Sequence, residues 1–117
     1  MKYLCLIHLS EPELAAMPDR DLRSLNAEHW ALNDQLRESG HYIVAEALQP
    51  ARDTACVRVR DGKSLVTDGP FAEAKEMIAG FYLIEAADLS EAAAIAARIP
   101  AARIGTVEVR PTRELII

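Results

Sequence analysis

The sequence predicts an α+β fold of the ferredoxin-like type, a sandwich in which two main helices cover one face of a mostly antiparallel sheet and a β-hairpin is inserted. Three observations predict this fold. Strand-like and helix-like segments follow one another in the order β-α-β, hairpin, β-α-β. With 117 residues, 50% of them hydrophobic and 26% charged, the chain matches one soluble domain spanning residues 1–117. Several strand-like segments are apolar on both alternating faces, as in strands covered on both sides.

The first strand is expected at Lys2–Leu9, where the sequence KYLCLIHL is apolar on both faces. This start lacks the small-residue cleavage site of a signal peptide, so we interpret it as a strand. Ser10 and Glu13 form a capping-box pattern, which predicts that a short helical turn begins there. Pro12 is tolerated in its first turn, and Pro18 ends it.

A longer helix is expected from Asp19, as its N-cap, to about Ser39, with Gly40 as its stop. Its apolar residues are spaced three and four apart, so they form one stripe that faces the sheet. The stripe consists of Leu22, Leu25, His29, Leu32 and Leu36. Burial in this stripe disfavours the charged form of His29. Two interpretations are open, a neutral core histidine bonded to a backbone carbonyl or a functional imidazole.

The middle of the chain predicts a strand and a hairpin. The segment His41–Leu48 is strand-like and ends at Gln49-Pro50. The runs TACVRVR and KSLVT flank Asp61-Gly62, which is a strong hairpin signal. A short helical stretch is then expected up to Met77.

The last third of the chain predicts the second β-α-β unit. A strand is expected at Ile78–Ala87, and Asp88 with Glu91 three residues later predicts a second helix cap. The helical run SEAAAIAARI is stopped by Pro100. The last strand is expected at Ile104–Pro111.

Composition excludes several functional classes. A net charge of -5 argues against non-specific nucleic-acid binding, which needs a basic surface. No apolar run approaches the roughly 20 residues that cross a bilayer, so we expect no membrane partner and a cytoplasmic location. Cys5 and Cys56 lie far apart without metal-ligand spacing, and we expect free thiols. With no phosphate loop and no nucleophile elbow either, we predict no metal and no cofactor. A metal site built by His8, His29 and His41 from three elements stays open as the less favoured alternative.

The apolar strands also predict a homodimer. A small sheet with apolar residues on both sides exposes a large patch as a monomer. Pairing two sheets face to face hides that patch, so we expect a dimer on burial grounds alone.

The stretch VTDGPFAEAKE, residues 66–76, forms a rigid corner after a strand. Gly69 gives backbone freedom and Pro70 fixes the next φ angle. One interpretation is that Asp68 caps a helical turn starting near Pro70, with Phe71 filling the core. We favour the other, in which the corner aims Asp68 towards a cavity at the end of the sheet. Capping is then a second role of the same carboxylate.

A longer stretch, TDGPFAEAKEMIAGFYLIEAADLSEA followed by VEVRP, closely resembles the YCII-related proteins, specifically the DGPF-domain branch. MKYLCLIHLSE, EHWALNDQLRESG and EALQPARDTACVRVRDG match as well, so the resemblance covers nearly the whole chain. It implies the dimeric α+β barrel, in agreement with the topology and the burial argument. It implies no established reaction. Members of the branch are often encoded beside extracytoplasmic-function sigma factors, which implies a regulatory setting.

The resemblance also implies a catalytic His/Asp pair in a cleft. The helix histidine of the family matches His29, and the acid of the DGPF loop matches Asp68. A carboxylate that accepts a hydrogen bond from one imidazole nitrogen fixes the tautomer, so the other nitrogen is able to act as a general base.

Four further residues are predicted to contact a ligand. Phe71 and Tyr82 supply an apolar wall, and Lys75 supplies a positive charge for an anion. His8 is included because members of the branch often carry Tyr at this position. If the His8 side chain lines the cavity, we expect the ligand preference to differ from that of members with Tyr at this position. Glu108 and Arg110 share one face of the last strand. An ion pair at the edge of the cavity is one interpretation of them, and we favour the other, an ordinary cross-strand surface pair.

Three hypotheses follow from these features. The first is a small cofactor-independent enzyme that uses His29 and Asp68 for acid-base chemistry on a small polar or aromatic molecule. The second is a non-catalytic dimer that binds a metabolite or regulates, and the third is a structural partner protein without a small-molecule site. The enzyme is placed slightly ahead of the binding protein.

Overall fold

The computed structural model describes residues 1–116 and confirms the α+β fold. Its main sheet is antiparallel with the strand order β2-β5-β1-β6, as in ferredoxin-like folds. The strands are β1 (Lys2–Leu9), β2 (Tyr42–Ala47), β5 (Met77–Glu85) and β6 (Thr106–Pro111). The predicted domain end at residue 117 lies outside the described residues.

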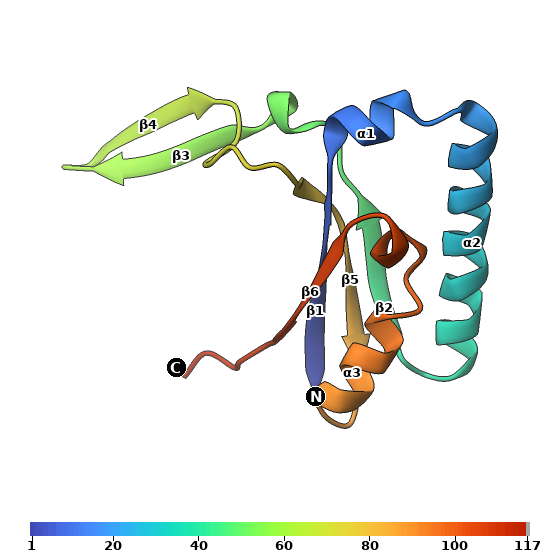
Figure 1. Ribbon diagram of the computed structural model, residues 1–117. Coiled ribbons are helices and arrows are strands. Elements are labelled where there is room, and N and C mark those ends of the chain that lie inside the picture. The colour runs from blue at the N-terminus through green and yellow to red at the C-terminus, as the bar shows by residue number, and fades with distance from the viewer. Residues whose placement is uncertain (117) are drawn as a thin grey trace.

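The helices cover one face of this sheet. They are α1 (Glu11–Ala16), α2 (Asp19–Glu38) and α3 (Leu89–Ala96), with short 3-10 turns at Ala51–Asp53 and Pro100–Arg103. Figure 1 shows α2 standing along one side of the sheet, with α3 near the chain's N-terminus. Within residues 1–116, no helix is both long and apolar enough to cross a membrane.

Two of the predicted caps are confirmed. The Ser10 hydroxyl accepts from the backbone N–H of Glu13 at 3.3 Å, and the Asp88 carboxylate accepts from that of Glu91 at 2.8 Å. The predicted cap at Asp19 is wrong, because α2 begins at that residue and Pro18 occupies the N-cap position without a side-chain bond. Asp19 still favours the helix, since a negative charge in the first turn complements the helix dipole.

The core lies between the helices and the sheet. Alternate residues of β1 point into it, and β5 and the two longer helices supply the rest. Its buried members on these elements are Tyr3, Cys5, Ile7, Leu9, Leu32, Leu36, Tyr82, Ile84, Ala92, Ile95 and Ala96. Burial raises the pKa of the Cys5 thiol to about 11, so this thiol stays protonated in the fold.

The opposite face of the sheet, which we call the open face, has no helix over it. The other alternate residues of β1, β2 and β5 point there, and those near the middle of the strands are apolar but only half-buried. They include Leu4, Leu6, Val44, Phe81 and Leu83. Residues 1–116 of one chain therefore leave an apolar face of the sheet without a cover.

The predicted hairpin is confirmed and forms a separate two-stranded sheet of β3 (Ala55–Arg60) and β4 (Lys63–Asp68). Its turn residues Asp61 and Gly62 have φ angles of 51° and 72°, as a tight hairpin turn with two left-handed residues requires. Figure 1 shows that this hairpin points away from the sheet on the side opposite to α2.

The helical stretch predicted up to Met77 is wrong. Residues 69–76 form a loop, which we call the DGPF loop, and β5 starts at Met77. A short helix needs an apolar face to pack, and residues 72–75 are all exposed. Phe71 does not fill the core either, since its exposed fraction is 79%.

One glycine fixes the approach of β6 to β1. A Cβ atom at Gly105 would overlap the carbonyl oxygen of His8 and would lie 2.6 Å from Cδ2 of Leu9. We therefore expect Gly105→Ala to lower the free energy of unfolding by at least about 2 kcal/mol, because backbone has to move.

Gly40→Ala is the matched comparison. A Cβ atom there meets open space, but φ is +81°, so only the left-handed conformation is strained. We expect a loss of about 1 kcal/mol in urea unfolding. Equal losses for the two variants contradict the close approach at Gly105.

Candidate functional site

The end of β1 places His8 on the open face beside the DGPF loop. The pairing of β1 with β5 shifts register between Ile7 and His8, where one strand bulges. Bulges of this kind re-aim side chains and occur near functional sites. On the other side of β1, His8 is paired with Thr106 of β6.

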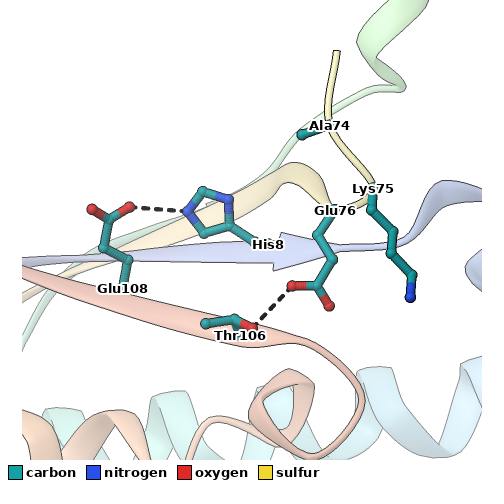
Figure 2. A pocket seen from close by; sticks show the side chains of 6 residues that line it. All are labelled: His8, Ala74, Lys75, Glu76, Thr106 and Glu108. Atoms are coloured by element: carbon teal, nitrogen blue, oxygen red, sulfur yellow. Dashed lines mark hydrogen bonds and ion pairs between the residues drawn. The ribbon is translucent and has the colours of Figure 1, made fainter. Parts of the chain in front are cut away.

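A pocket of about 570 Å³ surrounds His8, and Figure 2 shows the side chains that line it. Nε2 of His8 lies 3.1 Å from Oε1 of Glu108. The Thr106 hydroxyl donates to Oε1 of Glu76 at 2.9 Å, which ties the DGPF loop to β6. The exposed Lys75 side chain also lines the pocket, and within residues 1–116 its ammonium forms no ion pair.

A second pocket of about 600 Å³ adjoins the first and shares His8, Ala74 and Glu76 with it. Its walls are mainly apolar and come from the end of β2, the DGPF loop and the start of β5. They include Leu48, Pro50, Pro70, Phe71, Met77 and Ile78. We refer to the two pockets together as the His8 hollow. Each has a volume in the range of small-molecule sites, roughly 300 to 1,000 Å³.

The expected surface pair of Glu108 with Arg110 is wrong. Glu108 bonds to His8 across the strands instead. His8 and Glu108 lie diagonally across β1 and β6 on the open face, since His8 is opposite Thr106 and Glu108 is opposite Leu6. Long side chains reach across such a diagonal.

A second polar cluster lies on the helix side of the sheet. The buried Tyr82 hydroxyl donates to Oδ1 of Asn33 at 2.6 Å, and it lies 3.1 Å from Nδ1 of His29. A tyrosine has one hydroxyl proton, and Asn33 receives it, so His29 has to donate from Nδ1. This chain of bonds fixes the Nδ1–H tautomer and leaves the lone pair on Nε2 of His29 free to accept a proton.

Burial sets the protonation states in this cluster. It lowers the pKa of His29 below its ordinary value, an effect opposed by the Glu28 carboxylate and assisted by the Arg103 guanidinium. Glu28 and Arg103 form an ion pair with each other beside the ring. Burial likewise raises the pKa of Tyr82 to about 12, so this phenol remains protonated.

The structure brings the predicted residues together in two groups. His8, Phe71 and Lys75 line the His8 hollow, whereas His29 and Tyr82 meet on the helix side. Asp68 belongs to neither group. It ends β4, which lies on the other side of the sheet from α2 (Figure 1). The described residues of one chain therefore do not bring Asp68 to His29.

Sequence reasoning named Tyr82 and Glu108 but did not pair them with His29 and His8, and it did not identify Asn33, Glu76 and Thr106 as site residues. Asn33 lies four residues after His29 on the same helix, so the two side chains are on the same face. This spacing was the signal that could have identified Asn33. Glu76 and Thr106 gave no signal, because they meet through the pairing of distant segments. Among residues 1–116, no cluster of three or more His, Cys, Asp or Glu side chains is arranged to hold a metal ion.

Comparison with known proteins gives a consistent result. Residues 1–116 match the YCII-related domain family. An uncharacterized protein of Rhizobium meliloti (strain 1021) is 34% identical over 113 residues, which are 95% of this chain and 91% of that protein. The match thus covers the sheet, the helices and the inserted hairpin alike.

The lowered pKa of His29 predicts a pH-dependent stability. The imidazole of His29 binds a proton less readily in the folded state than in the unfolded state. Its effect on the free energy of unfolding is therefore fully favourable only above the ordinary histidine pKa of 6.5. We expect it to fall as the pH drops below 6.5 and to level off below the folded pKa. Urea unfolding between pH 8 and pH 5 measures this loss.

His29→Gln is expected to remove that part of the pH dependence, and His41→Gln is the control. His41 bonds through Nδ1 to the backbone carbonyl of Glu85 at 2.8 Å, away from the Tyr82 cluster. If the His29→Gln protein loses as much stability on acidification as the wild type, His29 is not the group responsible.

Proposed function

The chain belongs to the YCII-related family, and on this premise we propose that it is a homodimer that binds a small organic molecule in the His8 hollow. The observation that carries the proposal is the convergence of His8, Phe71 and Lys75. The sequence singles them out as ligand contacts, and they line adjoining pockets of about 570 and 600 Å³.

The lining of the hollow supports a ligand with two different ends. The second pocket offers mainly apolar walls, and Phe71 provides an aromatic face there. The first pocket offers the ammonium of Lys75, and the carboxylates of Glu76 and Glu108 already have hydrogen-bond partners. We therefore propose an aromatic or aliphatic body with an anionic or polar end directed at Lys75 and His8.

The homodimer part of the proposal rests on the open face. Its half-buried apolar side chains lie on the same side of the sheet as the His8 hollow. A second subunit packed there removes this surface from water, which is the main favourable term in such associations. A regulatory role beside a sigma factor, which the family resemblance implies, requires the same ligand site.

Acid-base catalysis is the second candidate function, and the Tyr82 cluster supports it. The fixed tautomer of His29 leaves Nε2 as a base, and its lowered pKa keeps this nitrogen unprotonated at neutral pH. In this version of the enzyme hypothesis, Tyr82 orients the imidazole of His29, which is the role that the sequence analysis gave to Asp68.

A thermal-shift screen tests the binding proposal, with small aromatic and aliphatic carboxylates as the panel. A ligand present at 100 times its Kd stabilises the folded state by about 2.7 kcal/mol, which raises the Tm by on the order of 10 °C. We expect Lys75→Ala and His8→Ala to weaken the binding of any hit at least tenfold in calorimetric titration.

Matched controls separate the hollow from general effects. Lys63→Ala removes an exposed lysine from the hairpin turn, and His41→Ala removes a histidine from the other end of the sheet. Both should bind as the wild type does. A hit that binds the hollow variants and the wild type equally contradicts the proposed site. Loss of binding in His29→Ala alone moves the site to the helix side.

A further inference from the structure

The β3–β4 hairpin, residues 55–68, forms an arm that the chain holds near its base, where the Cys56 thiol donates to the Gly69 carbonyl and the Arg58 guanidinium lies 5.7 Å from the centre of the Phe71 ring. Figure 1 shows it extending away from one end of the sheet on the open side. The radius of gyration of the chain is 16.2 Å. A compact domain of this length has a radius of about 13 Å. The arm therefore extends well beyond the body of the subunit.

The two faces of the arm differ in chemistry. Cross-strand partners share a face, so the pairing of Val57 with Val66 places both on the side that also carries Val59. The exposed fractions of these three valines are 63%, 63% and 59%. The opposite face carries Arg58, Leu65, Arg60 and Lys63. The arm is thus an amphipathic hairpin whose valine face is uncovered.

An isolated two-stranded hairpin is marginal in water, and its stability requires packing against another surface. The exposed surface of the whole chain also indicates a missing contact. It amounts to 8406 Å², which is about 2,100 Å² more than the roughly 6,300 Å² of a compact monomer of this mass. A standard interface buries about 800 Å² of each partner, and obligate homodimers bury more. The excess is of the size that a homodimer covers.

We propose that the arm packs its valine face against a second copy of this chain, so that each subunit holds the other. This proposal rests on the homodimer proposed above and names the element that secures it. The arm projects past the open face, and a six-residue strand is about 20 Å long. Two sheets stacked face to face lie only about 10 Å apart. A partner on the open face therefore lies alongside the arm.

Charge favours an acidic partner for the arm, and a second copy of this chain is one. Residues 55–68 contain Arg58, Arg60 and Lys63 against Asp61 and Asp68, a net charge of +1. The complete chain has a net charge of -5, which leaves -6 on the rest. A second copy thus offers the arm a surface of opposite sign, as complementary interfaces do.

The partner also completes the binding site. The second pocket of the His8 hollow is lined by Thr54, Pro70 and Phe71, which flank the base of the arm. Its opening lies on the side of the sheet where the partner packs. In the dimer, the second copy closes the His8 hollow, and each site is built from two chains.

Sedimentation equilibrium of the full chain tests this assignment. The double variant Val57→Lys/Val66→Lys places two ammonium groups on the valine face, and we expect its dimer dissociation constant to rise at least 100-fold. Leu65→Lys is the matched control on the basic face, with an expected change of less than threefold. These side chains are exposed in the single chain, so the fold of the subunit remains intact, which circular dichroism checks.

Phe81→Lys, on the open face, separates the two proposals. If Phe81→Lys dissociates the dimer and the valine-face variant remains as dimeric as the wild type, the arm assignment is wrong and the sheet-to-sheet dimer stands. A wild-type protein that is monomeric at 10 µM overturns both. Equal dissociation of Leu65→Lys and the double variant also overturns the assignment of the valine face.

The reactivity of a cysteine placed in the His8 hollow tests whether the partner closes it. Ala74 lines both pockets, so Ala74→Cys in a Cys56→Ser background reports access by its rate of reaction with a maleimide. We expect that rate to rise at least tenfold when Val57→Lys/Val66→Lys is added. Ala27→Cys on the exposed side of α2 should react at the same rate in both proteins. An unchanged rate at Ala74→Cys in dissociated subunits overturns closure by the partner.

Discussion

The central position of β1 is the constraint on which the rest of the structure depends. This strand pairs with β5 on one side and β6 on the other, and its residues are apolar towards both faces of the sheet. One chain covers only one of those faces, because its helices pack against the side that carries Tyr3, Cys5, Ile7 and Leu9. The side that carries Leu4 and Leu6 remains open. The arm and the His8 hollow both lie on that uncovered side.

The alternation of strand side chains also divides the polar chemistry of the protein between two environments. Tyr82 points towards the helices and meets His29 and Asn33 in a buried cluster, where an imidazole keeps a fixed tautomer. His8 points to the open face and meets Glu108 in a site that a ligand is able to enter. Because the sheet separates the two, a change of one residue in strand register would exchange these environments.

Much of the fold follows from local sequence. The pattern of apolar residues predicts the strands, Asp61-Gly62 predicts the hairpin, and the capping signals at Ser10 and Asp88 are correct, whereas those at Asp19 and Asp68 are not. The helix expected in the DGPF loop does not form, because its charged, helix-favouring residues have no apolar face to pack there. The site was partly predictable. Residue type singled out His8, Phe71 and Lys75, which line the hollow. The partner of His29, however, lies 53 positions away in sequence, and that of His8 lies 100 positions away. Such pairs depend on sheet register, which short motifs do not specify.

The basic face of the arm affects the tendency of free subunits of the proposed dimer to aggregate. Both strands of the arm are edges with unpaired backbone groups, and such edges readily recruit strands of other molecules into aggregates. Arg58 and Arg60 on one strand and Lys63 on the other place like charges along those edges. Two arms that approach edge to edge therefore repel each other. For the proposed dimer, these cationic side chains are gatekeepers, because they disfavour aggregation of the arm before its valine face packs against a partner.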